Sequence, residues 1–551
     1  MKRCPILART IVTVSALLAV SGVVELAAQG TPAAGTSGAA RASRSTPAST
    51  SAAKPAGTTA TKPAAKPSRA RENVNRRNDD GSTPLQWAVY EGDVAEVKRL
   101  LSAGADLTLA NKYGATPMSL AAEVGNAEIL GLLLEAGANA DSPNPEGQTA
   151  LLAVARTGNL KAAQLLLAKG ATVDAREKWG GQTALMWASA RRHPEMMQLL
   201  ISKGADVNAR STDRNYQRHV TAEGRPKSLD SGGLTPLLYA ARENCRACVD
   251  VLLKNRVDID LADPDGVSPL LVAIMNANWD LAQQLVMAGA DVNHWDMYGE
   301  SPLFIAINQR SKLDGGHASI DPMNQVNGLS MVKLLLDHGA NPNMQLFFKP
   351  ANLSGPTNTK GSTPLIRAAN NGDMDIVKLL LEKGADATLY TADRQTPIHA
   401  AILGRSAEAQ VGEMIRLFQK AGTDVNVVAL VNHPEEVRGG SALHYAVRKR
   451  QKETIKLLAS LGINMDAVDQ DGLTALDYTQ SRGFMPFMAL QTPVFKDEAA
   501  LLRELGATKL MAKNPDWPVL GPPQGIWDDI WPLGESAVHE PVYRPKTAST
   551  P

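Results

Sequence analysis

A segment that returns every 33 residues constrains this chain more than any other feature. Gly81, Gly114 and Gly147 each begin a copy, and the copies read GSTPLQWAVYEGDVAEVKRLLSAGADL, GATPMSLAAEVGNAEILGLLLEAGANA and GQTALLAVARTGNLKAAQLLLAKGATV. Further copies begin at Gly181, Gly233, Gly266, Gly299, Gly361, near Arg394, at Gly440 and at Gly472. A fixed period of this length is typical of proteins in which one small unit is stacked many times. The spacing therefore predicts about eleven units, some of them lengthened by insertions.

Each copy contains start and stop signals for two short helices. In the first copy Thr83 can cap a helix that begins at Pro84, because a first helical position does not need the N–H that proline lacks. Glycine adopts the left-handed conformation at low cost, so we expect the first helix to end at Gly92 and the second at Gly104. Neither helix can bury its apolar residues within one unit. Neighbouring units must therefore supply the core.

The unit resembles the ankyrin repeat. The period of that family and its Thr-Pro-Leu-His-x-Ala opening recur most clearly in TPIHAA from Thr396, and the resemblance covers nearly all of residues 81–510. It implies an all-α repeat solenoid of stacked helix-turn-helix units with hairpin loops, and binding to a protein partner. It also implies that His399 and His444, at the histidine position of the opening, make structural hydrogen bonds between repeats and serve neither as ligands nor as bases.

The segments on either side of the predicted solenoid, residues 76–510, have a different composition. Three bases precede an apolar run over residues 11–24, which predicts a signal peptide over about residues 1–30 and a periplasmic or secreted protein. An uncleaved membrane anchor is the alternative; otherwise we expect no transmembrane segment in the mature chain. Residues 31–75 are rich in Ala, Thr, Pro and Lys, which predicts a disordered linker.

The C-terminal segment, residues 511–551, is a tail rich in proline and tryptophan. Trp517, Trp527 and Trp531 could dock on the final repeat as a lid or could form a partner-binding motif. Just before it, residues 497–506 are expected to form the second helix of a polar capping unit.

The charge is distributed unevenly along the chain. Residues 1–80 contain 12 bases and four acids, which leaves 45 bases and 52 acids from Gly81 onward, a net charge of −7. Because clustered Lys and Arg supply most of the affinity for phosphates, an acidic body argues against a nucleic-acid partner. We expect a monomer that binds a protein partner.

The positions that stacking leaves free are the hairpin tips and the ends of the first helices, which by resemblance to the family line one concave face. The predicted partner-binding residues at the tips are Tyr113, Trp179, Trp295, Met297 and Tyr298. Those at the helix ends are Tyr90, Glu91, Glu123, Arg156, Arg191, Arg242, Asn308, Asn370, Lys449 and Arg450. Aromatic residues and arginine are over-represented among binding hot spots. For each of them, packing against the neighbouring repeat is the alternative. Three further aromatics are expected to lie mainly in the core: Trp87, Trp187 and Tyr239.

Four insertions lengthen the array, and loops of this kind often lie on the binding side. They span residues 210–232, 310–328, 344–360 and 427–439. The first is basic and could contact an acidic surface, although an ordinary solvated loop is the alternative; its residues of interest are Arg214, Tyr216, Arg218, Arg225 and Lys227.

Reactive chemistry is suggested only by the pair Cys245 and Cys248, which share a face at the start of a second helix. A disulfide fits an oxidising compartment, and a resting thiol pair or a redox-active pair are the alternatives. Haem attachment would need a histidine where Val249 stands, and zinc would need four ligands.

The common enzyme signatures are absent: the chain contains no phosphate-binding loop, dinucleotide fingerprint, zinc-protease helix or nucleophile elbow. We therefore expect no catalytic residues, no cofactor and no metal site. A thiol-disulfide protein, or an accessory factor that protects or matures an exported enzyme, are the alternative functions.

Overall fold

The computed structural model describes residues 73–213, 232–314, 324–347, 360–430, 439–470, 472–479 and 495–511. All of them belong to the unit formed by residues 71–551. Within these residues there are 21 α-helices, one short 3-10 helix and no strand longer than an isolated bridge. The expected all-α fold class is therefore confirmed.

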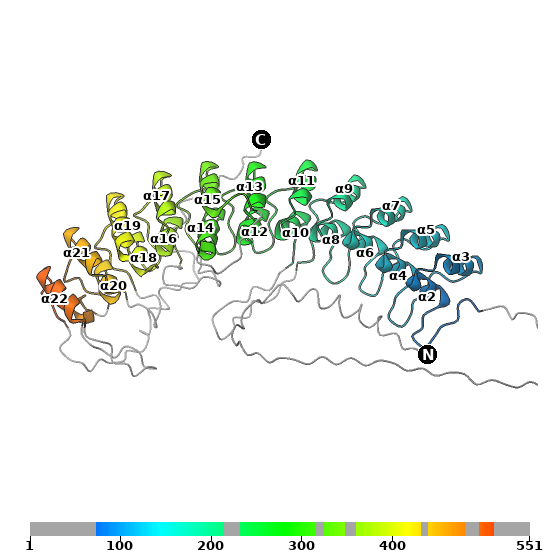
Figure 1. Ribbon diagram of the computed structural model, residues 1–551, viewed down its shortest axis with the longest axis horizontal. Helices are drawn as coiled ribbons and strands as arrows, with labels where there is room; N and C mark the ends of the chain where they lie inside the picture. Colours follow the sequence, from blue (N-terminus) through cyan, green and yellow to red (C-terminus); the bar gives the residue numbers. More distant parts are fainter. Residues whose placement is uncertain are drawn as a thin grey trace, which may run out of the picture. The chain divides into compact units, whose positions relative to one another are not determined.

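The helices alternate along the chain between two layers, which Figure 1 shows as two rows. The first helices of the repeats are α2 Pro84–Glu91, α4 Pro117–Val124, α6 Ala150–Thr157, α8 Ala184–Ala190, α10 Pro236–Arg242, α12 Pro269–Met275, α14 Pro302–Asp314, α16 Pro364–Asn371, α18 Pro397–Leu403 and α20 Ala442–Arg448. The second helices are α3 Val94–Ser102, α5 Ala127–Glu135, α7 Leu160–Ala168, α9 Pro194–Ser202, α11 Arg246–Lys254, α13 Trp279–Met287, α15 Gly328–Asp337, α17 Met374–Glu382, α19 Glu408–Lys420 and α21 Lys452–Ser460. The last repeat consists of the 3-10 helix η1 Asp477–Thr479 and α22 Lys496–Glu504.

These pairs make eleven repeats in the described part of the chain, numbered here 1 to 11 in chain order, and they match the number that the glycine spacing predicts. Each first helix packs on the first helices of the adjoining repeats, and each second helix packs on its own partner and on its neighbours. One continuous cluster of buried apolar residues extends from Leu85 in repeat 1 to Ala507 in repeat 11. The core is thus shared between repeats, as the sequence predicts.

The helix boundaries follow the predicted local signals. The Thr83 hydroxyl accepts a hydrogen bond from the Gln86 N–H (3.3 Å), and the Gln86 side chain accepts one from the Thr83 N–H (2.7 Å). This reciprocal capping fixes the start of α2. The same Gln86 amide donates to the Ala115 carbonyl of the next repeat, so one side chain both begins a helix and joins two repeats.

Histidine performs this double role in the later repeats. The His444 Nδ1 accepts from the Ser441 N–H (3.1 Å), and its Nε2 lies 3.0 Å from the Leu473 carbonyl of repeat 11. His399 caps α18 through the Thr396 N–H (3.2 Å), and its ring lies edge-on to Tyr445 of repeat 10. The hydrogen bond between repeats that the resemblance implies is therefore confirmed for His444, whereas His399 contacts the next repeat through its ring.

Hydrogen bonds between loops add a polar contribution to the repeat interfaces. In the loops after the second helices, the Asp106 N–H donates to Asn75 and the Asp291 N–H donates to Asp260. At the hairpin tips, the Lys178 N–H donates to the Glu146 carbonyl (2.9 Å). Each repeat thus satisfies backbone groups of the next, which fixes their register.

In most repeats the turn after the first helix needs a left-handed residue. Gly158 meets this need in repeat 3 with a φ of 75°, but the equivalent residue of repeat 4 is Arg192, with a φ of 60°. An arginine in this conformation places its Cβ close to the following carbonyl, which costs free energy that a glycine does not lose.

We therefore predict that Arg192→Gly raises the free energy of unfolding by about 1 kcal/mol. Urea denaturation followed by circular dichroism measures this change. Gly158→Ala is the opposite substitution at the equivalent site of repeat 3 and should lower stability. An Arg192→Gly protein that is no more stable than the wild type would show that this backbone is unstrained.

The burial of His399 predicts a pH dependence. Burial lowers the pKa of His399 from 6.5 to about 4, so the folded state keeps the ring neutral while the unfolded state takes up a proton. The stability that the neutral ring contributes is complete above pH 6.5 and is lost as the pH falls towards 4.

His399→Gln keeps a capping side chain of the Gln86 kind but cannot titrate. The loss of unfolding free energy between pH 7 and pH 4.5 should therefore be smaller in this variant, by about 2 to 3 kcal/mol. Burial raises the pKa of Asp296 to about 6, so this residue makes the protein more stable as the pH falls. The effect is the same in both proteins and cancels when they are compared. Equal losses in the two proteins would contradict the prediction.

Candidate partner-binding surface

The most exposed tryptophan of the described residues lies on the tip before repeat 4. Trp179 is 55% exposed. The carboxylate of the neighbouring Glu177 is buried and accepts hydrogen bonds from the N–H groups of Trp179 (2.6 Å), Gly180 (2.7 Å) and Gln182 (3.0 Å). The tip is therefore held in one conformation while the indole ring stays accessible to a partner.

A second exposed aromatic residue has the same support. Tyr113, on the tip before repeat 2, is 50% exposed. The buried side chain of Asn111 accepts from the N–H groups of Tyr113 (3.0 Å) and Ala115 (2.9 Å). Between these two tips Pro145 packs against the backbone of Gly114, where even one added carbon would overlap the proline ring. The three tips are thus adjoining and rigid.

The aromatic tips before repeat 7 and in the following insertion pack on one another. Trp295 meets Phe347 edge to face, with ring centroids 5.9 Å apart, and both rings are half-buried. Tyr298 and Met297 are half-buried as well, and the Tyr298 N–H donates to buried Asp296 (2.9 Å). These residues combine partial exposure with packing inside the array.

The predicted residues at the helix ends differ in how far they face outward. Exposed Arg191 makes no ion pair within the described residues, whereas Arg156 pairs with Glu123 (2.7 Å) of the preceding repeat. Arg242 pairs with Glu243 (3.0 Å). The remaining placements are as follows: Tyr90 half-buried beside Trp87, Asn370 half-buried, and Glu91 and Lys449 exposed.

Two of these side chains are occupied by the array itself. Asn308 is buried and accepts a hydrogen bond from Arg367. Arg367 is buried as well, and this burial lowers its pKa to about 10. Arg450 donates to the buried carboxylate of Glu498 (3.2 Å) and lies over the Phe495 ring. Both therefore contribute to contacts between repeats.

Among the aromatics expected in the core, Tyr239 is buried and hydrogen-bonded to Gln182, whereas Trp87 and Trp187 are half-buried. Trp187 therefore keeps part of its ring on the surface of α8. The supporting role of Glu177 was missed in the sequence, although the 34-residue spacing between Gly147 and Gly181, one more than the period, marks its tip as unusual.

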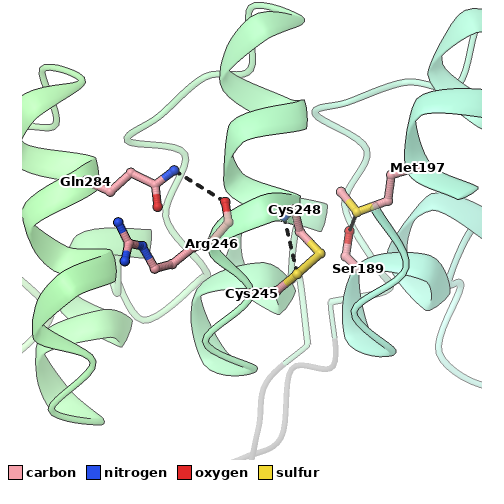
Figure 2. The surroundings of a disulfide bond; sticks show 6 residues. All are labelled: Ser189, Met197, Cys245, Arg246, Cys248 and Gln284. Carbon is pink, nitrogen blue, oxygen red and sulfur yellow. Dashed lines mark hydrogen bonds between the residues drawn. A yellow bond between two sulfur atoms is a disulfide. The ribbon is translucent and has the colours of Figure 1, made fainter. Parts of the chain in front are cut away.

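The cysteine pair forms a disulfide at the start of α11 (Figure 2). Cys245 is the N-cap residue, and its sulfur accepts a hydrogen bond from the Cys248 N–H (3.3 Å). Figure 2 shows Ser189 and Met197 of repeat 4 on one side of it and Gln284 of repeat 6 on the other. Cys245 is 4% exposed and Cys248 is fully buried, so the bond is enclosed by the stack.

A cavity of about 470 Å³ opens where repeats 7, 8 and 9 meet. Arg310 at its wall pairs with Asp373 (2.5 Å) and lies 3.8 Å from a carboxylate oxygen of Asp375. Arg310 is thus neutralised within the wall, which also contains Arg405. In the described part of the chain, no cluster of three or more His, Cys, Asp or Glu could hold a metal ion, and no helix is long and apolar enough to span a membrane.

Several predicted features lie outside the described residues. They are the signal peptide, the linker up to residue 72, the basic residues Arg214, Arg218, Arg225 and Lys227 with Tyr216, and the tail tryptophans Trp517, Trp527 and Trp531.

Known proteins resemble this chain over part of their length. The mouse B-cell lymphoma 3 protein homolog is 28% identical over 186 residues, which are 33% of this chain and 35% of that protein. The human transient receptor potential cation channel subfamily A member 1 is 25% identical over 43% of this chain and 18% of its own. The E3 ubiquitin-protein ligase KEG of Arabidopsis thaliana is 25% identical over 48% of this chain and 15% of its own. The chain thus spans well under half of these curated relatives.

A solved structure and two family profiles complete the comparison. The crystal structure of the ankyrin repeat domain of Bcl-3 shares 27% identity, covers 41% of this chain and 95% of its own, and has a TM-score of 0.35. The profile described as ankyrin repeats (3 copies) matches residues 62–144, 120–211, 237–315 and 323–429, and the single ankyrin repeat matches residues 298–345 and 438–470. Because these matches cover more than half of the chain, the protein belongs to the ankyrin-repeat family.

Proposed function

We propose that this protein is a non-catalytic scaffold that acts outside the cytoplasm and binds a protein partner through its hairpin tips and the ends of its first helices. Membership of the ankyrin-repeat family supports a protein partner. The apolar run over residues 11–24 and the disulfide both favour an oxidising compartment.

The observation that carries the proposal is the combination of exposure and rigidity at Trp179. More than half of this residue is exposed, yet three hydrogen bonds to the buried carboxylate of Glu177 hold the backbone of its tip. A loop whose backbone is ordered before binding loses little entropy on binding, which favours its exposed aromatic side chain as a hot spot.

We predict that Trp179→Ala weakens partner capture at least tenfold without changing stability, because removal of a central aromatic hot spot costs about 2 kcal/mol or more. Immobilised wild-type and variant proteins, exposed to extract of the source cells and analysed by quantitative mass spectrometry, give the measurement.

The control variant is Met287→Ala. Met287 is 65% exposed and lies at the end of α13, in the other layer, so its removal tests for unspecific apolar adhesion. Equal loss of the captured protein with both variants, or equal recovery with Trp179→Ala and wild type, would count against the proposed surface.

A second candidate function is thiol-disulfide exchange, because a Cys-x-x-Cys pair at a helix N-terminus is the arrangement that redox proteins use. Exchange requires a thiolate to reach one sulfur atom of the bond. The burial of both residues between repeats 4 and 6 leaves no such access in the folded state. A structural role therefore fits the pair better.

We predict that Cys245→Asn/Cys248→Ala lowers the free energy of unfolding by about 2 kcal/mol or less, because the closed loop is very short and asparagine can cap α11 again. Urea denaturation measures this effect. An insulin-reduction assay of the wild type tests the alternative: turnover that disappears in this variant would replace the structural role with a catalytic one.

A further inference from the structure

Four arginines lie at the ends of α6, α8 and α10, in three consecutive repeats. They are Arg156, Arg191, Arg192 and Arg242, and we call them the arginine strip. The three helices pack side by side. A ring nitrogen of His193, the residue after Arg192, lies 3.3 Å from the Arg156 carbonyl oxygen, which ties the turn of repeat 4 to the end of α6.

The strip carries more positive charge than its surroundings neutralise. Arg156 pairs with Glu123, and Arg242 pairs with Glu243. Arg191 and Arg192 are exposed and make no ion pair with any residue that the structure describes. Two cations thus face solvent together on a body whose net charge from Gly81 onward is −7.

The backbone of Arg192 adds an independent argument. Three other non-glycine residues have a positive φ after a first helix. Asn244 is of a type that tolerates this conformation, Ala277 is buried in the core, and Arg450 binds Glu498. Arg192, with a φ of 60°, has no such contact in the described residues. A strained backbone position that brings no structural benefit indicates a functional role.

One partly exposed aromatic ring accompanies the strip, that of half-buried Trp187 in α8. The Arg242 guanidinium lies over the buried Tyr239 ring, 5.0 Å from its centre. Arginine combined with tryptophan and tyrosine is the composition of hot spots at protein interfaces. Guanidinium groups also bind carboxylates in a two-pronged geometry that lysine cannot form.

We propose that the arginine strip binds an acidic segment of the partner protein, with its aspartate or glutamate carboxylates on Arg191 and Arg192. This inference rests on the proposed scaffold function and names the chemistry of its partner. A nucleic-acid backbone fits less well, because Glu123 and Glu243 are part of the same surface and two unneutralised charges give little phosphate affinity.

The test uses the full chain and a fluorescein-labelled peptide of six Glu-Gly repeats, with a Gln-Gly peptide of equal length as the neutral probe. Fluorescence anisotropy should show that the protein binds the acidic peptide and not the neutral one, and that this binding weakens as the salt concentration rises. Arg191→Gln/Arg192→Gln should weaken it at least tenfold. Lys169→Gln/Lys203→Gln removes the same charge at the ends of α7 and α9 and should change it less than twofold.

The single variant Arg192→Gly separates function from stability. It removes one cation together with the backbone strain, so it should bind the acidic peptide several-fold more weakly while unfolding at a higher temperature. A wild type that ignores the peptide, or equal weakening by the arginine and lysine variants, would overturn the inference. If Trp179→Ala still weakened partner capture in that case, the proposed scaffold function would be retained.

A third experiment tests whether the C-terminal tail of this chain, in place of a partner protein, occupies the arginine strip. The C-terminal tail contains Asp528 and Asp529 between two tryptophans and could compete for the strip. Truncation after Met511 should leave peptide affinity within twofold of the wild type. A gain of more than tenfold would show that the tail occupies the strip, and the proposed partner segment would be wrong.

Discussion

Each helix pair of this protein buries its apolar side chains only against the pairs beside it, and every other feature depends on that contact. Leu100 of α3 and Ile129 of α5 are fully buried although neither helix has a closed core of its own. Stability therefore accumulates from one interface to the next. Because stacking uses one edge of each helix, the tips and helix ends can present exposed side chains such as Trp179.

One position shows how different residues can meet the same structural need. The N-cap of the second helix is Asn159 in repeat 3 and Asn278 in repeat 6, and each amide donates to a carbonyl of the preceding repeat. In repeat 4 His193 takes this place, and in repeat 5 Cys245 does. The disulfide thus substitutes for a polar cap at a site that already joins helix and neighbour, which explains its burial better than redox chemistry does.

The features that could be predicted from the sequence are those encoded within one repeat. Thr83, Pro84 and Gly92 define α2 by local hydrogen bonding and backbone preference, so their effect is visible within ten residues of sequence. Asn308 could not be recognised as buried, because its partner Arg367 lies beyond an insertion and in the next repeat. The ion pair between Arg310 and Asp373 has the same origin. When two contacting residues are separated by an insertion of variable length, their spacing in the sequence is not fixed, so the contact cannot be predicted from it.

A stack held together by nearest-neighbour contacts can concentrate unfavourable features in one repeat without unfolding the rest. Repeat 4 and its tip contain the buried carboxylate of Glu177, the exposed ring of Trp179 and the strained backbone of Arg192, while its interfaces keep the same apolar core as the others. In a single-core domain the backbone strain at Arg192 would reduce one shared stability. Here the adjoining repeats retain their own interfaces, so selection for binding can act on repeat 4 almost independently of selection for folding.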